Sequence, residues 1–180
     1  MFEWIKESLT VGNATVKYPF APLELIPDSR GKPEHDALAC IVCGACATAC
    51  PPNALQMHLD LPNNNYIWQI NYGRCIFCGR CEEVCPVKAI ELTQEFELAV
   101  MSKDDMLETA TYSLQRCALC NKQYAPSKEI DYLNSLLDSF AQNDEEVQRA
   151  KEQLSICPQC RRIAESANVK FICEQLERRA

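Results

Sequence analysis

Histidine and glycine are scarce in this chain of 180 residues, which contains two histidines, His35 and His58, and five glycines. It has no Gly-rich loop of the kind that binds phosphate groups. We therefore find no set of residues suited to proton abstraction, hydride transfer or nucleophilic attack in a pocket. We expect that the chain is not catalytic by itself.

Long hydrophobic runs are also missing, and so is a secretory signal. No apolar run approaches the roughly 20 residues that a helix needs to cross a bilayer, so we expect no membrane-spanning segment. The first residues, Met1 to Trp4, carry neither a basic segment nor a small-residue cleavage site. These absences predict a reducing cytoplasmic environment, in which thiols stay available for metal.

Positive charge is in the minority. The 25 acidic residues outnumber the 18 lysine and arginine residues, which gives a formal net charge of −7 at pH 7. This excess argues against nucleic acid as a partner, because the phosphates would be repelled.

Cysteine, in contrast, is abundant, and eight of the 13 cysteines form two copies of one motif. Each copy reads Cys-x2-Cys-x2-Cys-x3-Cys-Pro, and the second begins 35 residues after the first. This spacing is the signature of proteins with two [4Fe-4S] clusters, in which the fourth cysteine of each motif binds the other cluster. The predicted ligands are Cys40, Cys43, Cys46 and Cys85 for cluster 1, and Cys75, Cys78, Cys81 and Cys50 for cluster 2.

Zinc sites and disulfide bonds are the alternatives for these eight cysteines. Zinc sites usually combine C-x2-4-C pairs across a spacer, and the repeated motif does not have that form. Disulfides are disfavoured by the expected reducing environment. Two oxidised clusters would each add about −2, so the loaded protein would carry a charge of about −11.

Residues 1–12 show the pattern of a short amphipathic helix. Phe2, Ile5 and Leu9 recur at helical spacing with Trp4 beside them, and Gly12 is placed to end the helix. Such a helix can pack on its own domain, or it can rest at a membrane interface or on a membrane subunit. The composition leaves both possibilities open.

Residues 13–36 are expected to form an extended arm, because they contain several prolines and few periodic apolar positions. The prolines are Pro19, Pro22, Pro27 and Pro33. Disorder is the alternative, but the segment is too apolar to be left in water. Its apolar residues include Tyr18, Phe20, Leu23, Leu25 and Ile26. We interpret the arm as a segment that binds a partner.

Residues 37–100 hold both motifs and are predicted to form a two-[4Fe-4S] ferredoxin domain. The repeat extends beyond the cysteines, because Ala54-Leu55 after the first motif matches Ala89-Ile90 after the second. This duplication predicts pseudo-twofold symmetry.

A β-hairpin is predicted between the two motifs. Apolar and polar residues alternate from Leu55 to Asp60, the segment Pro62–Asn65 forms a turn, and Tyr66–Ile70 returns as the second strand. His58 should then face solvent and have no ligand role.

Residues 101–180 are predicted to form a helical lobe. Ser102-x-x-Asp105 resembles a capping box, and Leu107, Ala110 and Leu114 follow it at helical spacing. Two more helices are expected, one from Ile130, Leu133, Leu137 and Phe140, and one, after a cap at Asn143-x-x-Glu146, from Val147, Ala150 and Leu154.

Two C-x2-C pairs lie at the two ends of this helical hairpin. They are Cys117 with Cys120 and Cys157 with Cys160. Four thiolates in a tetrahedron suit structural zinc or a single rubredoxin-like iron, so we predict a mononuclear metal site. Free thiols and a third cluster are the alternatives. Cys173 is left over and is interpreted as a buried small hydrophobic residue.

Several runs of sequence resemble a known family. The run Cys75–Pro86, preceded by Tyr18-Pro19 and Arg30-Gly31-Lys32-Pro33, is similar to the two-cluster ferredoxin subunit shared by complex I and membrane-bound hydrogenases. Three features are similar to the formate hydrogenlyase and hydrogenase-4 branch in particular. They are Thr15-Val16-Lys17-Tyr18-Pro19-Phe20-Ala21-Pro22, Phe96-Glu97-Leu98-Ala99-Val100 and the C-terminal Cys pairs.

Together with the patterns above, the resemblance predicts an α+β fold. This fold would be a bacterial-type two-[4Fe-4S] ferredoxin with an N-terminal amphipathic helix, an extended arm and a C-terminal helical lobe with a four-cysteine metal site. The resemblance implies an electron-transfer subunit of a membrane-bound complex, which relays electrons between a formate dehydrogenase module and a NiFe hydrogenase. The implied partners are the hydrogenase large and small subunits, another iron–sulfur subunit and membrane subunits. The implied location is peripheral, on the cytoplasmic side of the inner membrane.

Three other functions remain open. The first is the equivalent subunit of an NADH:quinone oxidoreductase, against which the C-terminal Cys pairs count. The second is a free ferredoxin, which would gain nothing from the arm or the N-terminal helix. The third is a structural adaptor whose clusters never turn over.

The fold of an electron carrier must hold its two centres close together and exclude water from them. We expect Ile41, Val42, Ile76 and Phe77 to cover the clusters. Backbone N–H groups in the cysteine loops should donate hydrogen bonds to the sulfurs and so tune their potentials.

Overall fold

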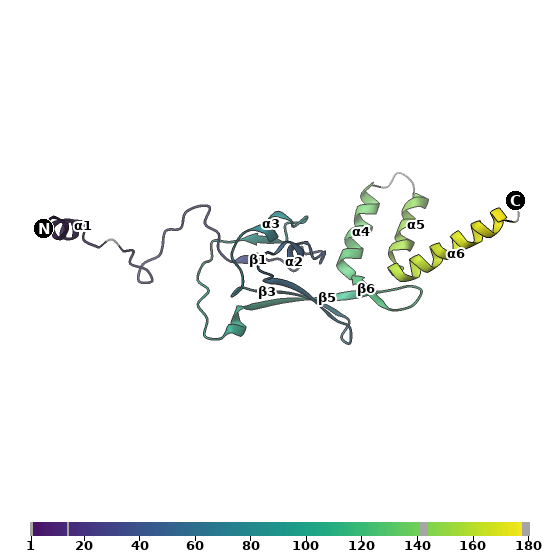
Figure 1. Ribbon diagram of the computed structural model, residues 1–180, viewed down its shortest axis with the longest axis horizontal. Coiled ribbons are helices and arrows are strands. Elements are labelled where there is room, and N and C mark those ends of the chain that lie inside the picture. The colour runs from purple at the N-terminus through teal and green to yellow at the C-terminus, as the bar shows by residue number, and fades with distance from the viewer. Residues whose placement is uncertain (1, 14, 141–143, 178–180) are drawn as a thin grey trace.

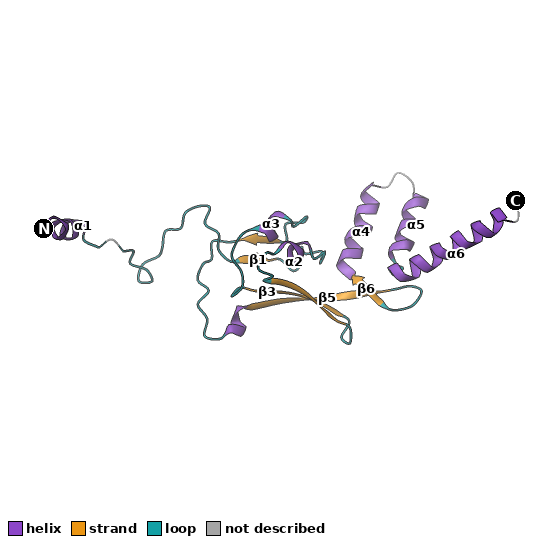
Figure 2. Ribbon diagram, in the orientation of Figure 1, coloured by secondary structure: helices purple, strands orange, loops and turns teal. Residues whose placement is uncertain are grey.

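The computed structural model describes residues 2–13, 15–140 and 144–177, although not the side chains of 168 and 170–177. The protein is elongated, with three parts in a row (Figure 1). Helix α1 (Glu3–Val11) lies at one end, the sheets with two short helices lie in the middle, and three longer helices form the other end (Figure 2).

The middle part contains a two-stranded sheet and a β-hairpin. Strand β1 (Pro33–His35) pairs antiparallel with β4 (Ile90–Leu92). The hairpin consists of β2 (Leu55–Asp60) and β3 (Asn65–Asn71), which confirms the predicted hairpin, and His58 is exposed as expected.

The predicted internal repeat appears in the pairing of these strands. Leu55 in β2 pairs with Ile70 in β3. In the repeat, Ile90 corresponds to Leu55 and His35 corresponds to Ile70, and these two residues also pair with each other. Two short helices, α2 (Ala45–Ala49) and α3 (Arg80–Glu83), follow the first cysteines of each motif and pack against each other. The two halves therefore complete each other's sheets, as pseudo-twofold symmetry requires.

One hydrophobic core joins the two halves. Trp68 and Ile70 from β3 and Ile90 from β4 are almost fully buried. The remaining buried members are Val42, Leu55, Tyr72, Cys81 and Tyr112. Several motif cysteines pack against this core, so the cluster loops rest directly on it.

The predicted helix over Leu107–Leu114 is wrong, because this segment is strand β5 (Leu107–Arg116). The capping box at Ser102 and Asp105 does form, but it opens only a 3-10 turn, η1 (Lys103–Met106). In β5 the more buried residues, such as Tyr112 and Leu114, alternate with exposed ones, and the strand pairs along β3. Pairing with β3 therefore overrides the local helical spacing.

A four-stranded sheet with the order β2-β3-β5-β6 results, and β6 (Gln123–Pro126) is its last strand. This sheet crosses the predicted boundary between residues 100 and 101. The region 101–180 is consequently not a purely helical lobe, because its first part extends the sheet of the ferredoxin domain.

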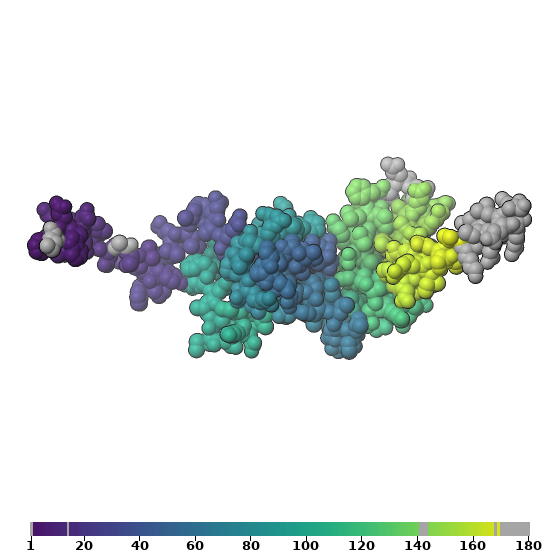
Figure 3. Space-filling model, in the orientation of Figure 1, coloured from purple at the N-terminus to yellow at the C-terminus, as the bar shows by residue number. Residues whose placement is uncertain are grey.

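The arm ends earlier than residue 36. Gly31 N–H donates to Thr93 O at 2.7 Å and Lys32 N–H donates to Glu95 O at 2.6 Å, and β1 follows directly. From residue 15 to residue 26 the chain is largely exposed and contains a turn at residues 18–20, and Phe20 is 96% exposed. Figure 3 shows this N-terminal segment projecting from the body of the molecule.

Helix α1 ends before Gly12, as expected, and buries none of its described residues. Trp4 is 69% exposed and Leu9 is 79% exposed. The possibility that α1 packs on its own domain is therefore not the arrangement in this structure.

The far end of the molecule is helical. It comprises α4 (Ser127–Phe140), α5 (Asp144–Leu154) and α6 (Pro158–Glu177). Helices α4 and α5 form the predicted hairpin, although the expected cap at Asn143 lies outside the described residues. The side chain of Cys173 also lies outside them. None of the described helices is both long and apolar enough to span a membrane.

Candidate iron–sulfur and metal sites

The two predicted sets of cluster cysteines line two separate cavities. The first set lines one cavity together with side chains from β1, β2, β3 and β4. Its cysteines are Cys40, Cys43, Cys46 and Cys85. Cys85 thus reaches this cavity from the second motif. We call this space the first cavity.

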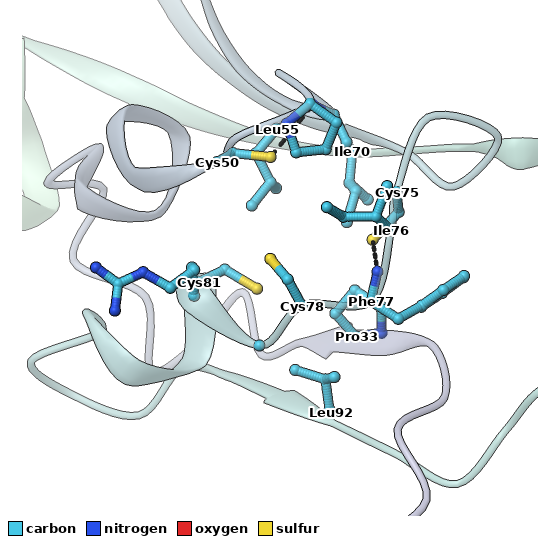
Figure 4. Close-up of a pocket in the computed structure, with 14 residues that line it drawn as sticks. Pro33, Cys50, Leu55, Ile70, Cys75, Ile76, Phe77, Cys78, Cys81 and Leu92 are labelled. Carbon is cyan, nitrogen blue, oxygen red and sulfur yellow. Dashed lines mark hydrogen bonds between the residues drawn. The ribbon is translucent and has the colours of Figure 1, made fainter.

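The second cavity is lined by Cys50, Cys75, Cys78 and Cys81. Figure 4 shows Cys50 opposite Cys78 and Cys81, with their sulfur atoms turned toward a common space. Cys50 therefore faces the cysteines of the other motif, as its place after α2 allows.

The loops that carry the first cysteines have matching backbone conformations. Val42 has a φ of 63° and Phe77, 35 residues later, has a φ of 52°. This left-handed conformation is strained for a β-branched residue such as Val42. It turns the N–H of Val42 toward Cys40 Sγ at 3.3 Å and that of Phe77 toward Cys75 Sγ at 3.4 Å. The expected backbone donors to sulfur are therefore present.

The fourth cysteine of each motif is held in the same way. Ala54 N–H donates to Cys50 Sγ at 3.2 Å, and Ala89 N–H donates to Cys85 Sγ at 3.1 Å. These two alanines are nearly buried, so both contacts are shielded from water. Each cavity thus contains two sulfur atoms that already accept a backbone hydrogen bond.

The protonation of these thiols depends strongly on burial. Burial raises the pKa of Cys81 to about 11, and it also raises the pKa of Cys46 and of Cys75. Such thiols are protonated at neutral pH in the metal-free chain, and they become thiolates only when a metal replaces the proton. Four thiols around one apolar cavity form a donor set that fits a [4Fe-4S] cluster.

The residues expected to cover the clusters line the cavities. Ile41 and Val42 line the first cavity, and Ile76 and Phe77 line the second. Val42 is buried, whereas Ile76 is 60% exposed. The second cavity is therefore covered in part by Ile76, a side chain that is itself exposed to solvent.

The two C-terminal Cys pairs also come together. The sulfur atoms of Cys117, Cys120, Cys157 and Cys160 all lie within 4.8 Å of one another. Cys157 N–H donates to Cys117 Sγ at 3.2 Å, and Cys160 N–H donates to Cys157 Sγ at 3.4 Å. The N–H groups of Cys157 and Cys120 lower the pKa of Cys117 to about 6, so this sulfur is a thiolate at neutral pH.

Backbone contacts hold the two pairs in register. The turn between β5 and β6 is closed by Asn121, whose φ is 59° and whose N–H donates to Cys117 O at 2.9 Å. Ala118 N–H then donates to Ser155 O at 3.0 Å, and the Tyr124 hydroxyl donates to Leu154 O. The first pair is thereby tied to the end of α5, where the second pair begins.

Three polar side chains near the first cavity were not singled out from the sequence. His35 and Trp68 line it, with their rings stacked at 3.8 Å, and Tyr112 reaches the same region from β5. The offset of 35 residues does not single out His35 and Trp68, because it matches them with Ile70 and Pro33. Tyr112 could not be found in this way, because the local spacing around it indicates a helix and not the strand β5.

Comparison with known proteins identifies a domain family at the centre of the chain and a relative along most of its length. Residues 39–89 match the 4Fe-4S dicluster domain. The chain is 46% identical over 162 residues to formate hydrogenlyase subunit 6 of Escherichia coli (strain K12), covering 90% of this chain and 89% of that protein. A solved structure of the membrane-bound sulfane sulfur reductase, an archaeal respiratory membrane complex, contains a chain with 28% identity and a TM-score of 0.46, over 58% of this chain and 57% of that one. The chain belongs to the family of formate hydrogenlyase subunit 6, with an iron–sulfur dicluster domain at its centre.

Proposed function

We propose that this chain is an electron-transfer subunit of a membrane-bound formate hydrogenlyase or hydrogenase complex. The observation that carries the proposal is the pair of similar cavities, each lined by four cysteines. When bound, two [4Fe-4S] clusters supply one-electron redox chemistry, and the chain's own residues position them and exclude water. The relative named formate hydrogenlyase subunit 6 favours this complex over an NADH:quinone oxidoreductase.

The ligand sets that we propose are crossed between the motifs. Cys40, Cys43, Cys46 and Cys85 hold cluster 1, and Cys75, Cys78, Cys81 and Cys50 hold cluster 2. Their support is that Cys85 lines the cavity of the first motif and Cys50 lines that of the second. Because each cluster needs a cysteine from both halves, neither cluster forms unless both halves fold.

The chain itself is proposed to be non-catalytic. Apart from cysteines, the second cavity is lined by apolar residues and Arg80, and it offers no general base. Among the side chains that line the first cavity, only His35 could act as a general base, and its ring is stacked against Trp68. Substrate chemistry is therefore assigned to other subunits.

A mononuclear metal, zinc or iron, is proposed for the C-terminal four-cysteine site. A tetrahedral zinc with Zn–S distances of about 2.3 Å places its sulfurs about 3.8 Å apart. The Cys120 and Cys157 sulfurs lie 3.8 Å apart, and all four lie within 4.8 Å. This spacing suits one ion better than a cluster, whose ligands are more widely separated.

The N-terminal helix and arm are proposed to bind the partner subunits. Their apolar side chains, including Phe2, Trp4, Leu9 and Phe20, are exposed in the single chain. The proposed partners are the hydrogenase large and small subunits, another iron–sulfur subunit and membrane subunits. In this arrangement the chain is a peripheral subunit on the cytoplasmic side of the inner membrane.

Metal analysis of the anaerobically purified chain, combined with EPR after reduction, tests the cluster assignment. We expect about eight iron and eight acid-labile sulfide with one zinc, or about nine iron if the C-terminal site holds iron. Four iron or fewer in intact chain would contradict the presence of two clusters.

A pair of substitutions tests the crossed ligand sets. Cys50→Ala should remove the EPR signal of cluster 2, although Cys50 lies in the first motif, and Cys85→Ala should remove that of cluster 1. Cys43→Ala and Cys78→Ala identify which signal belongs to which cluster. If Cys50→Ala and Cys43→Ala lose the same signal, the ligand sets are not crossed.

A further inference from the structure

The two cavities have matching sets of four cysteines but differ in the other side chains that line them. The lining residues of the first cavity include His35, Met57, Trp68 and Ile90. Each of these residues has a counterpart in the other half of the repeat, 35 residues later or earlier, and the counterparts line the second cavity. In the same order, they are Ile70, Leu92, Pro33 and Leu55. Two polar rings at the first cavity thus correspond to Ile70 and Pro33, which have no side-chain hydrogen-bond donor.

The polar atoms at the first cavity are buried without partners. Trp68 Nε1, His35 Nε2 and the Tyr112 hydroxyl are each inaccessible to water and have no hydrogen-bond partner in the part of the chain that the structure describes. Trp68 is only 1% exposed. Most buried polar groups in proteins are satisfied, so three such groups beside one cavity indicate an acceptor that belongs in it.

Two of these groups lie close to the cysteines of cluster 1. Trp68 lines the first cavity together with Cys40 and Cys46. Cys40 and Cys46 also pack against the buried core that contains Trp68 and Tyr112. Indole N–H and phenol O–H groups are donors, and the acceptors beside them are sulfur atoms.

We propose that Trp68 Nε1–H and the Tyr112 O–H donate hydrogen bonds to sulfurs of cluster 1 and raise its reduction potential. A reduced cluster carries one more negative charge, so donors to its sulfurs stabilise the reduced state more than the oxidised state. Cluster 2 has no equivalent side-chain donors among the residues that line its cavity at the matching positions. This inference rests on the ligand sets proposed above.

Each donor is held in place by a neighbour. The His35 ring stacks on the indole of Trp68 at 3.8 Å with an interplanar angle of 16°. Lys128 Nζ lies 5.6 Å from the centre of the Tyr112 ring, and it also donates to Ala37 O and Leu38 O just before Cys40. The C-terminal part of the chain therefore contributes to the first cavity through Tyr112 and Lys128.

Two cationic side chains act near the second cavity, because Arg80 lines it and Arg30 donates to Cys78 O at 3.0 Å. These guanidinium groups also affect the potential of cluster 2. The effect of the donors is consequently measured as a shift of cluster 1 between variants, and not as a difference between the two clusters.

The test is a potentiometric EPR titration of the full chain with both clusters loaded. Trp68→Phe keeps an aromatic ring but removes the N–H donor. We expect the ratio of reduced to oxidised cluster 1 to fall threefold to tenfold at a fixed potential, where tenfold corresponds to about 59 mV for one electron. Tyr112→Phe should shift the same cluster in the same direction. Trp4→Phe, which makes the same change in an exposed residue of α1 outside both cavities, should change neither potential.

A second measurement does not depend on any variant that might fail to load clusters. The chain has two tryptophans, and we label both indole nitrogens with 15N. Pulsed EPR of the reduced wild-type chain should show a 15N coupling to cluster 1 that persists in Trp4→Phe. Absence of this coupling, or unchanged potentials in both donor variants, would overturn the inference. Low iron and sulfide content would instead contradict the proposed function.

Discussion

Gly31 occupies a position at which no side chain fits. A Cβ atom there would lie 2.3 Å from Glu95 O, a backbone atom that cannot move away alone. Gly31→Ala should therefore separate residues 31–32 from 93–95 and destabilise the ferredoxin domain by about 1–3 kcal/mol or more. Thermal unfolding of the loaded chain measures this effect. Gly73→Ala is the control, because the flexible side chain of Met106, whose sulfur lies 3.0 Å from the added Cβ, can move away. Equal melting temperatures for both variants would contradict this account.

Tyr72 links three strands through one hydroxyl group. The hydroxyl donates to Glu108 Oε2 at 2.5 Å and lies 3.1 Å from Pro33 O. Tyr72→Phe should cost about 1.5–3 kcal/mol, the range for hydrogen bonds to charged groups. Denaturant unfolding at pH 7 measures this cost, and Glu108→Gln, which keeps an acceptor, should cost less.

The Tyr72 contact should also depend on pH. Burial and the neighbouring Glu108 raise the pKa of Tyr72 well above the value of about 10 that it has in the unfolded chain. The folded state therefore favours the protonated form, and its contribution is complete below pH 10 and is lost as the pH rises further. Wild-type protein should lose stability above pH 10 faster than Tyr72→Phe. Parallel stability curves for the two proteins would exclude this linkage.

A site residue can be predicted from the sequence when it belongs to a motif of short, fixed spacing. It cannot be predicted in this way when strand pairing between distant segments brings it to the site. The eight cysteines proposed as cluster ligands can be recognised from the sequence, because they recur twice at the same short spacing. Trp68 and Tyr112 reach the first cavity through strand pairing between distant segments. Their role depends on where their side chains point, and the spacing of one sequence does not contain that information.

At the scale of elements, Lys128 in the first turn of α4 connects the C-terminal helices to the loop that precedes Cys40. Its ammonium donates to Ala37 O and Leu38 O, both at 2.7 Å. Lys128→Gln should loosen the loop before Cys40 and speed the loss of cluster 1 to an iron chelator. Lys151→Gln is the control, because it breaks only an exposed ion pair with Asp138, and such pairs contribute about 0–1 kcal/mol. Equal rates of cluster loss in Lys128→Gln and Lys151→Gln would show that the hydrogen bonds of Lys128 do not protect cluster 1.

Two elements differ from their sequence-based prediction for the same physical reason. Leu107, Ala110 and Leu114 fit a helix, yet the same segment alternates in burial and contains the β-branched Thr109 and Thr111. Its partner β3 lies some 40 residues earlier in the chain. Likewise, residues 31–35 of the arm pair with the strand after the second motif. In both cases a long-range hydrogen-bond ladder determines the structure.

At the scale of the whole molecule, the N-terminal helix and the cluster domain should be separable. Because α1 buries none of its described residues, removal of residues 1–12 should leave both EPR signals unchanged. Leu9→Glu should reduce co-purification with the other subunits, since it places a charge on the exposed apolar face of α1. Ser8→Glu adds the same charge at a polar position and should have little effect. If Leu9→Glu co-purifies like wild type, α1 does not bind the partners.

The four-cysteine site should stabilise the helical end independently of the clusters. Among the described residues, α4 buries only Ile130 and α5 buries none, so we expect these two helices to depend on the metal proposed for the four cysteines. Cys120→Ser should therefore increase hydrogen exchange of amides in α4 and α5. Amides of β5 that pair with β3 should stay protected, because that ladder belongs to the sheet of the cluster domain. Both EPR signals should persist in this variant. If they disappear together with the protection of α4 and α5, the two ends of the molecule fold as one unit and the metal site supports the clusters as well.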